Sequence, residues 1–199
     1  MWLTQLLMAM VRLLVGANPR WLGSRPSEAQ RIYFANHSSH IDTVALWSAL
    51  PPDLRSKTRP VAAADYWKHG RIRRLIAIQG LNVVFVERKN REAGKNPLDP
   101  LKDALAQGDS LIIFPEGTRH AQALPEPFKA GLYHLALAFP EVELIPVYLD
   151  NLHRSLPKGS FFPVPLLCTV RFGPALARID EEPKDDFLLR ARQAMVDLA

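Results

Sequence analysis

Short apolar runs alternate with segments of helical periodicity along most of the chain, and this alternation constrains the fold more than any other feature. The strand-like runs are RIYFAN, RPVAAADY, NVVFVER, SLIIFPE, VELIPVYLD and VPLLCTVRFG. Several are apolar on both faces, which is typical of central strands. Helical patterns lie at residues 43–50, 67–79, 99–107, 129–139 and 187–198. The sequence therefore predicts a single α/β domain, with a mixed, largely parallel sheet and helices on both faces.

The N-terminal segment MWLTQLLMAMVRLLV carries a single charge, Arg12. It is shorter than the roughly 20 apolar residues that span a bilayer. On an ideal helix its polar side chains fall within about 100° of one another. That pattern is typical of an amphipathic helix lying in a membrane interface, with Trp2 and Trp21 as aromatic anchors. We therefore expect a membrane-interface helix at 1–22 and the main α/β domain at 23–199. A helix packed on its own domain and a cleaved signal peptide are the alternatives.

Charge and cysteine content indicate where such a chain works. Between residues 55 and 91, ten Lys and Arg side chains face two acidic ones, although the whole chain carries only +5. A basic segment of this kind indicates either an anionic partner, such as a membrane surface, phosphate or nucleic acid, or a solvated helix face. The single cysteine, Cys168, fits a reducing compartment and lies in an apolar run that predicts a packed core thiol. We expect a peripheral protein on the cytoplasmic face of a membrane.

The segment NHSSHID places two histidines and an aspartate within residues 36–42. Ser39 and Asp42 fit a capping box, with Ser39 as the N-cap and Asp42 at the third helical position. His37 then lies in the loop before the helix. Residues five apart on one helix diverge by about 140°, so His37 and Asp42 can meet only if the histidine is outside the helix. A helix cap and a pair formed by a general base and its orienting acid are therefore compatible.

One other enzyme interpretation of this region and one non-enzyme interpretation of the chain stay open. His37, His40 and Asp42 are candidate ligands of a metal-dependent hydrolase, but the remaining histidines form no second ligand cluster. A serine hydrolase would need an unmarked nucleophile, because the chain has no G-x-S-x-G elbow. The non-enzyme alternative is a basic membrane- or nucleic-acid-binding module that uses residues 55–91.

Further motifs follow NHSSHID in order. They are VFVER at 84–88, FPEGTR at 114–119, FKAGLYHLA from Phe128, and IPVYL at 145–149. Together with the Asn-His-x4-Asp pattern, these segments resemble the ordered blocks of the glycerolipid acyltransferase family, which includes the lysophosphatidic acid acyltransferases. FPEGTR is the most specific of them. Two positions depart from the family pattern: Asn82 stands where glycine is usual, and His120 stands where serine is common.

The resemblance implies an α/β acyltransferase held at a membrane surface. Its donor would be acyl-CoA or acyl carrier protein. Its acceptor would be the free hydroxyl of a lysophospholipid, with 1-acylglycerol 3-phosphate as the expected acceptor and phosphatidate as the product. It implies no metal and no bound cofactor, and no nucleic-acid partner.

Acyl transfer to an alcohol needs a base, because a protonated hydroxyl is a poor nucleophile. We expect His37 to be that base and Asp42 to hold its other ring nitrogen, while the substrate supplies the nucleophile.

Acceptor binding is expected at the ends of two strands, where ligands gather in α/β sheets. The predicted substrate-binding residues are Arg88, Glu116, Gly117, Thr118 and Arg119. The arginines suit phosphate, the glycine permits close approach of the main chain, and Glu116 and Thr118 can bond glycerol oxygens or hold the arginines. Lys129 is interpreted only as a cation at a helix start and is left out of this set.

Overall fold

A computed structural model describes residues 18–39, 41–64, 81–87, 96–120, 122, 124–150 and 168–199. Its strands are β1 Asn18–Trp21, β2 Arg31–Ala35, β3 Thr58–Ala63, β4 Val84–Val86, β5 Ser110–Ile113, β6 Glu143–Asp150 and β7 Thr169–Phe172. Its helices are α2 Asp42–Ala49, α3 Pro52–Ser56, α6 Asp99–Ala106, α7 Gly131–Ala138 and α9 Lys184–Val196. The helix predicted at 67–79 and residues 1–17 of the predicted interface helix lie outside the described residues.

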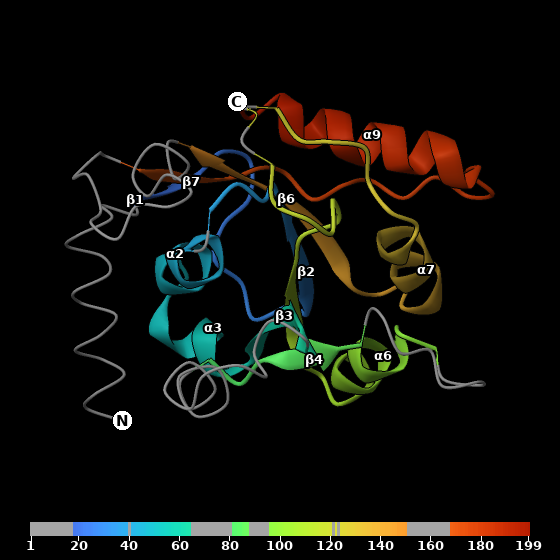
Figure 1. Cartoon of the computed structure of the whole chain (residues 1–199), viewed down its shortest axis with the longest axis horizontal. Coiled ribbons are helices and arrows are strands. Elements are labelled where there is room, and N and C mark those ends of the chain that lie inside the picture. The colour runs from blue at the N-terminus through green and yellow to red at the C-terminus, as the bar shows by residue number, and fades with distance from the viewer. Residues whose placement is uncertain are drawn as a thin grey trace.

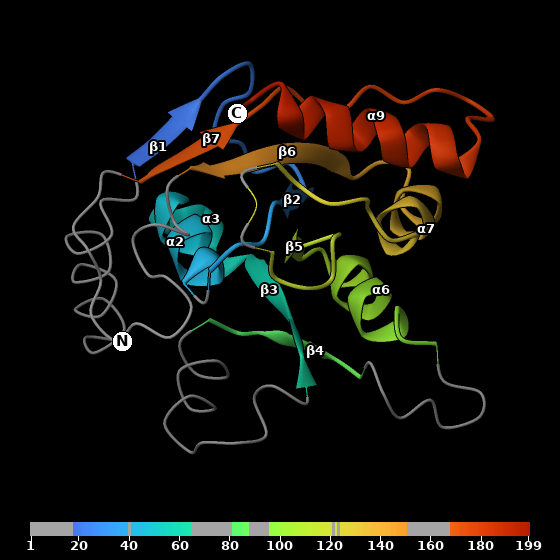
Figure 2. The same cartoon turned by 45° about the horizontal axis from the view of Figure 1, so that its top comes forward.

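The described strands form one sheet in the order β1-β7-β6-β2-β5-β3-β4 (Figure 1). All neighbouring pairs of described strands are parallel except β6 and β7, which run antiparallel. Figure 2 shows α2 and α3 on one side of the sheet and α6, α7 and α9 on the other. The predicted α/β class, with a mixed and largely parallel sheet covered on both faces, is confirmed.

Both faces of the sheet are buried, because its central strands are apolar at successive positions. In β2, Tyr33 and Ala35 pack into the cluster beneath α2, whereas Ile32 and Phe34 pack into the cluster beneath α6, α7 and α9. Strand side chains alternate between faces, so a continuous apolar run serves two cores at once. Cys168 is fully buried in the first cluster, as predicted for a core thiol.

The parallel strands bring distant motifs to one edge of the sheet. β2, β5, β3 and β4 are consecutive and parallel, so their carboxyl ends lie at the same edge. His37 follows β2 at this edge, and the segment 114–119 follows β5. β4 ends here as well, two residues before Arg88 in the sequence, although Arg88 itself lies outside the described residues. This edge is where α/β sheets bind ligands.

The sheet begins earlier in the chain than the sequence predicted. Residues 18–21, placed in the interface helix by sequence, form β1 and pair in parallel with β7. Trp21, expected as a membrane anchor, stacks on Phe172 with 4.0 Å between ring centroids and 10° between planes. The strand was missed because NPRW has no apolar alternation. The short helix α3 was also not predicted. No helix within the described ranges is long and apolar enough to cross a bilayer.

Candidate active site

His37 lies in a short loop whose start is fixed to the sheet. The side chain of Asn36, the first residue after β2, continues the pairing with β6: its Oδ1 accepts from Leu149 N at 2.7 Å, and its Nδ2 donates to Leu149 O at 3.1 Å. The amide side chain thus imitates one more residue of the strand ladder. His37 therefore leaves the sheet from a rigid point.

The predicted contact between His37 and Asp42 is present. His37 Nδ1 lies 2.8 Å from Asp42 Oδ2, with the histidine in the loop and the aspartate as the first residue of α2. The same oxygen accepts the main-chain N–H of Ser38 at 2.6 Å and of Ser39 at 2.7 Å. Asp42 is fully buried, so these three donors replace the water that would solvate its charge.

The capping box was predicted wrongly in part. α2 begins at Asp42 with Ile41 as its N-cap, and the buried Ser39 Oγ has no hydrogen-bond partner among the described residues. The carboxylate reaches back to the Ser39 N–H, as in a capping box, but the serine does not return the bond. A Ser39 N-cap would require the helix to begin at residue 40, but α2 begins at Asp42. The Asp42 carboxylate therefore organises the loop that carries His37.

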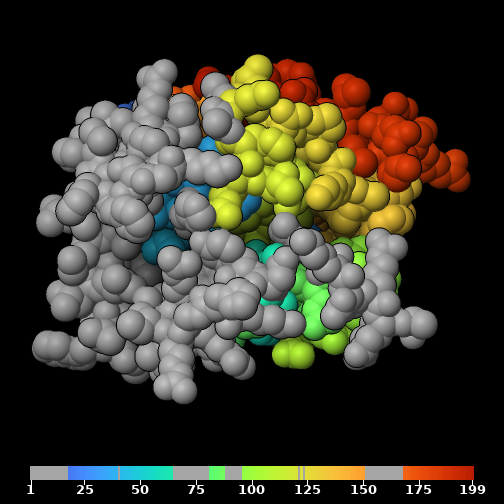
Figure 3. Space-filling model, in the orientation of Figure 1, coloured from blue at the N-terminus to red at the C-terminus, as the bar shows by residue number. Residues whose placement is uncertain are grey.

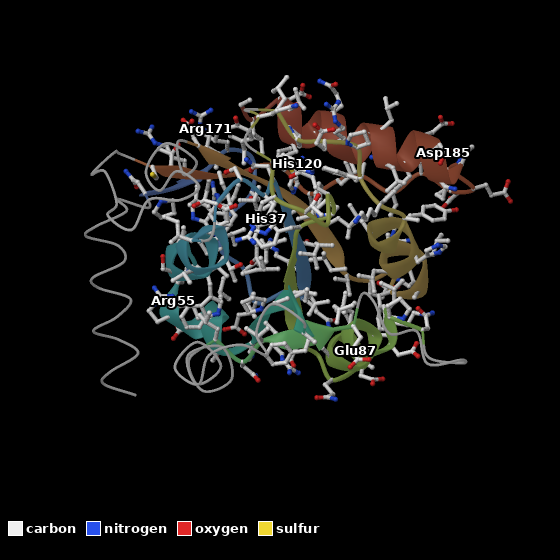
Figure 4. All side chains as sticks on the ribbon, viewed as in Figure 1. His37, Arg55, Glu87, His120, Arg171 and Asp185 are labelled. Atoms are coloured by element: carbon white, nitrogen blue, oxygen red, sulfur yellow. The ribbon has the colours of Figure 1, made fainter. Side chains whose placement is uncertain are left out.

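His37 makes three further contacts, one through its ring and two through its main chain. Its ring stacks on Phe114, with 4.2 Å between centroids and 20° between planes. Its main-chain N–H donates to Glu116 Oε1 at 2.6 Å, and its carbonyl accepts from His120 N at 2.9 Å. Figure 4 shows His37 and His120 close together. The side chain remains 19% exposed, so Nδ1 is engaged while the imidazole is still open to a substrate.

Glu116 contacts the main chain of two loops. It is only 4% exposed, and its two oxygens accept from His37 N at 2.6 Å and Glu126 N at 2.8 Å. Burial raises the pKa of Glu116, while the bonds from these two N–H groups and the nearby His120 and His37 act in the opposite direction. These contacts are those of a residue that positions the His37 loop. Its direct binding of substrate stays a prediction.

The remaining residues of the FPEGTR segment lie on a turn at the surface. Gly117 has φ +75°, a conformation that glycine adopts without strain, and its N–H donates to Phe114 O at 2.9 Å. Thr118 and Arg119 are exposed, and Thr118 Oγ1 lies 2.8 Å from His120 Nε2. In Figure 3 the yellow-green atoms of the segment after β5 lie at the surface beside blue atoms of the N-terminal part of the domain.

The structure thus brings together His37, Asp42, Glu116, Gly117, Thr118 and Arg119 at one edge of the sheet. Sequence reasoning missed the support given by Asn36 and Phe114. Asn36 had a signal, since a polar residue directly after a buried strand needs a partner. Phe114 had none, because an aromatic residue at a strand end is ordinary.

Both departures from the family pattern can be placed. Asn82 has φ +49°, so the left-handed backbone that glycine adopts without strain is kept here by asparagine, which enters this region more readily than most side chains. His120 follows the turn of the FPEGTR segment, and its N–H bonds to the carbonyl of His37.

The hypothesis of a metal-dependent hydrolase requires a cluster of metal-binding side chains. No group of three or more His, Cys, Asp or Glu side chains there is arranged to hold a metal ion. His40, the third candidate ligand, lies outside the described residues. Nδ1 of His37 faces a carboxylate oxygen that already accepts two other hydrogen bonds, which is the arrangement of a base and its orienting acid.

Comparison with solved structures supports the fold. The crystal structure of the 1-acyl-sn-glycerophosphate (LPA) acyltransferase PlsC from Thermotoga maritima superposes with a TM-score of 0.71. The superposition covers 98% of this chain and 79% of that one, at 18% sequence identity. At this identity the likeness shows the common fold.

Comparison of sequences identifies the family. A 1-acyl-sn-glycerol-3-phosphate acyltransferase of Limnanthes alba is 28% identical over 155 residues, which are 77% of this chain and 53% of the relative. The enzyme of the same name from Haemophilus influenzae is 27% identical over 135 residues, 64% of this chain and 51% of the relative. The chain spans about half the length of these curated relatives. The acyltransferase family model matches residues 22–150, which include every motif described above, and the chain therefore belongs to the acyltransferase family.

Proposed function

We propose that this chain moves a fatty acyl group from acyl-CoA or acyl carrier protein to the free hydroxyl of 1-acylglycerol 3-phosphate, giving phosphatidate. The observation that carries the proposal is the 2.8 Å contact between His37 Nδ1 and the buried Asp42, at the edge that also receives the FPEGTR turn. Family membership and the names of the relatives support the choice of acceptor.

The paired histidine supplies the proton transfer that an alcohol needs. With Asp42 on Nδ1, the other ring nitrogen, Nε2, is left to accept the proton of the acceptor hydroxyl. As that proton leaves, the hydroxyl oxygen attacks the thioester carbonyl and forms the new C–O bond. When the C–S bond breaks, the proton on Nε2 passes to the departing thiolate. The products are an ester and a free thiol, so the balance requires no metal, redox cofactor or acyl-enzyme.

The surroundings of His37 restrict the imidazole to one orientation. Phe114 covers one face of the ring, Asp42 holds Nδ1, and Glu116 and His120 hold the main chain on both sides of the residue. Base catalysis contributes about 10²–10⁴-fold, and correct positioning of two bound substrates contributes on the order of 7–11 kcal/mol. Placement of both substrates against this fixed imidazole is therefore expected to contribute more than the proton transfer itself.

Phosphate binding is assigned to the two arginines. Arg119 is exposed just beyond the Gly117 turn, and Arg88 follows β4, which ends at the same edge of the sheet. A guanidinium can bind a phosphate through two parallel hydrogen bonds, which fixes direction as well as charge. We further propose peripheral attachment to the cytoplasmic face of a membrane through the N-terminal segment, because the lysophospholipid acceptor partitions into membranes.

The direct test incubates the purified chain with labelled acyl-CoA or acyl carrier protein and a panel of lysolipids: lysophosphatidate, lysophosphatidylethanolamine, lysophosphatidylcholine and monoacylglycerol. We expect labelled phosphatidate from one or both donors, and no product from the His37→Ala variant. Release of free fatty acid without transfer, abolished by a chelator, would favour the metal-dependent hydrolase. Salt-sensitive binding of nucleic acid without turnover would favour the basic binding module.

A further inference from the structure

Lys129 lies against the FPEGTR turn, although sequence alone suggests only a cation at a helix start. Its main-chain N–H donates to Pro115 O at 2.9 Å. Its side chain then runs over Gly117: a methyl group built on this glycine would lie 2.5 Å from Lys129 Nζ and 2.9 Å from its Cδ and Cε. The ammonium group is therefore next to the main chain between Glu116 and Thr118.

Helix stability does not explain a lysine at this position. α7 begins at Gly131, has Ala130 as its N-cap and has no acidic residue in its first turn. The N-terminal end of a helix carries partial positive charge, so a nearby cation costs roughly 0.3–1 kcal/mol. No carboxylate of the described residues is within ion-pair distance of the exposed Lys129 ammonium.

The absence of a side chain at Gly117 is what lets Lys129 approach. The turn has φ +75° there, and any larger residue would displace the lysine. The FPEGTR turn and the segment that starts at Phe128 thus form one unit, joined by the Lys129 main chain and by its side chain. This unit carries Lys129 and Arg119, both exposed, and it contacts the His37 main chain through Glu116.

We propose that Lys129 binds the acceptor's phosphate group and makes the site selective for a phosphate monoester; this assignment rests on the proposed function. A phosphate monoester carries a charge of about −1.5 to −2 at neutral pH. A phosphate diester carries a single negative charge. The ammonium adds a cation to the turn that carries Arg119 and can donate to a phosphate oxygen from any direction, as a point charge. Acceptors whose head group is a diester or carries no phosphate gain less from it.

The test uses Lys129→Met, which keeps methylene groups over Gly117 and removes the charge, and Lys129→Arg, which keeps the charge. Lys184→Met is the matched control, because Lys184 is also an exposed lysine at a helix start, at the beginning of α9. Its neighbour Asp185 lies far from His37 in Figure 4. Steady-state constants are measured with lysophosphatidate, lysophosphatidylethanolamine and monoacylglycerol as acceptors, and separately for acyl-CoA.

We expect Lys129→Met to raise the KM for lysophosphatidate about 10- to 100-fold, the usual value of one charge-assisted hydrogen bond. The KM for acyl-CoA and turnover with monoacylglycerol should stay within about twofold, Lys129→Arg should recover most of the loss, and Lys184→Met should behave as wild type. Three results would overturn the role of Lys129 and leave the proposed function intact. They are an unchanged KM for lysophosphatidate, an equal loss with all acceptors, and a loss confined to acyl-CoA. A wild-type chain that acylates no lysolipid would overturn the proposed function and this assignment with it.

Discussion

Asp42→Asn separates the charge of the proposed orienting acid from its shape. Asp42 Oδ2 accepts from His37 Nδ1, Ser38 N and Ser39 N, whereas the buried Oδ1 has no hydrogen-bond partner among the described residues. The asparagine carbonyl can take the place of Oδ2 and keep all three donors. Its NH2 group then takes the place of Oδ1. The loop should keep its conformation while the charge beside the imidazole is lost.

The size of the effect follows from the distance. Two unit charges about 4 Å apart attract by about 4 kcal/mol at an effective dielectric constant of about 20, and the 2.8 Å contact is shorter than that. A neutral hydrogen bond retains about 1 kcal/mol. The imidazolium that forms during attack therefore loses about 3 kcal/mol of stabilisation, or roughly a hundredfold in turnover at 1.36 kcal/mol for each factor of ten. His37→Ala, which removes the base itself, should cost more and abolish measurable transfer.

The assay is turnover at saturating concentrations of both substrates, with a thermal melt of each variant. Burial of an unpaired amide NH2 costs about 1–3 kcal/mol, so Asp42→Asn should melt lower but remain folded at the assay temperature. Asp185→Asn is the control: Asp185 is an exposed acidic residue in the first turn of α9, far from His37 in Figure 4. It should keep full turnover. Equal and mild losses for His37→Ala and Asp42→Asn would refute the assignment of base and orienting acid.

Three further predictions follow from the site and the N-terminal segment. Arg119→Ala and Arg88→Ala should each raise the KM for the acceptor about 10- to 100-fold and leave the KM for the donor unchanged; a loss confined to the donor would reverse the assignment. Deletion of residues 1–15 should release the protein from vesicles in flotation assays and make the residual binding salt-sensitive. Activity on long-chain substrates should fall more than activity on short ones. Unchanged flotation, or a much lower melting temperature, would contradict an interface helix. Because burial raises the pKa of Glu116 above 4.5, its protonated form adds stability in acid that is lost as the pH rises through that raised pKa. The melting temperature of wild type relative to Glu116→Gln should therefore be highest in acid and fall toward neutral pH, and a constant difference would show that the carboxyl does not titrate as inferred.

Much of the fold could be predicted from apolar patterning. The runs at β2, β5 and β6 were found because strands buried on both faces leave continuous apolar sequence. α2, α6 and α7 begin and end within two residues of their predicted bounds, and α9 begins three residues before its own. β1 was missed, since an edge strand with the sequence NPRW gains its place by pairing with β7 and by the stacking of Trp21 on Phe172. The antiparallel direction of β7 was equally beyond local reasoning.

The contact between His37 and Asp42 was within reach of the sequence alone, because the two residues are five apart across the junction of a strand and a helix, and local geometry brings them together. The tertiary structure decided what surrounds that pair. Glu116 reaches the His37 main chain across 79 residues, because β2 and β5 are parallel neighbours whose carboxyl ends meet at one edge. Lys129 reaches Gly117 for a similar reason, since the chain after the turn folds back and bonds to Pro115. Contacts of this range depend on which strands become neighbours, and that choice is made by the packing of the whole core and not by any segment of the sequence on its own.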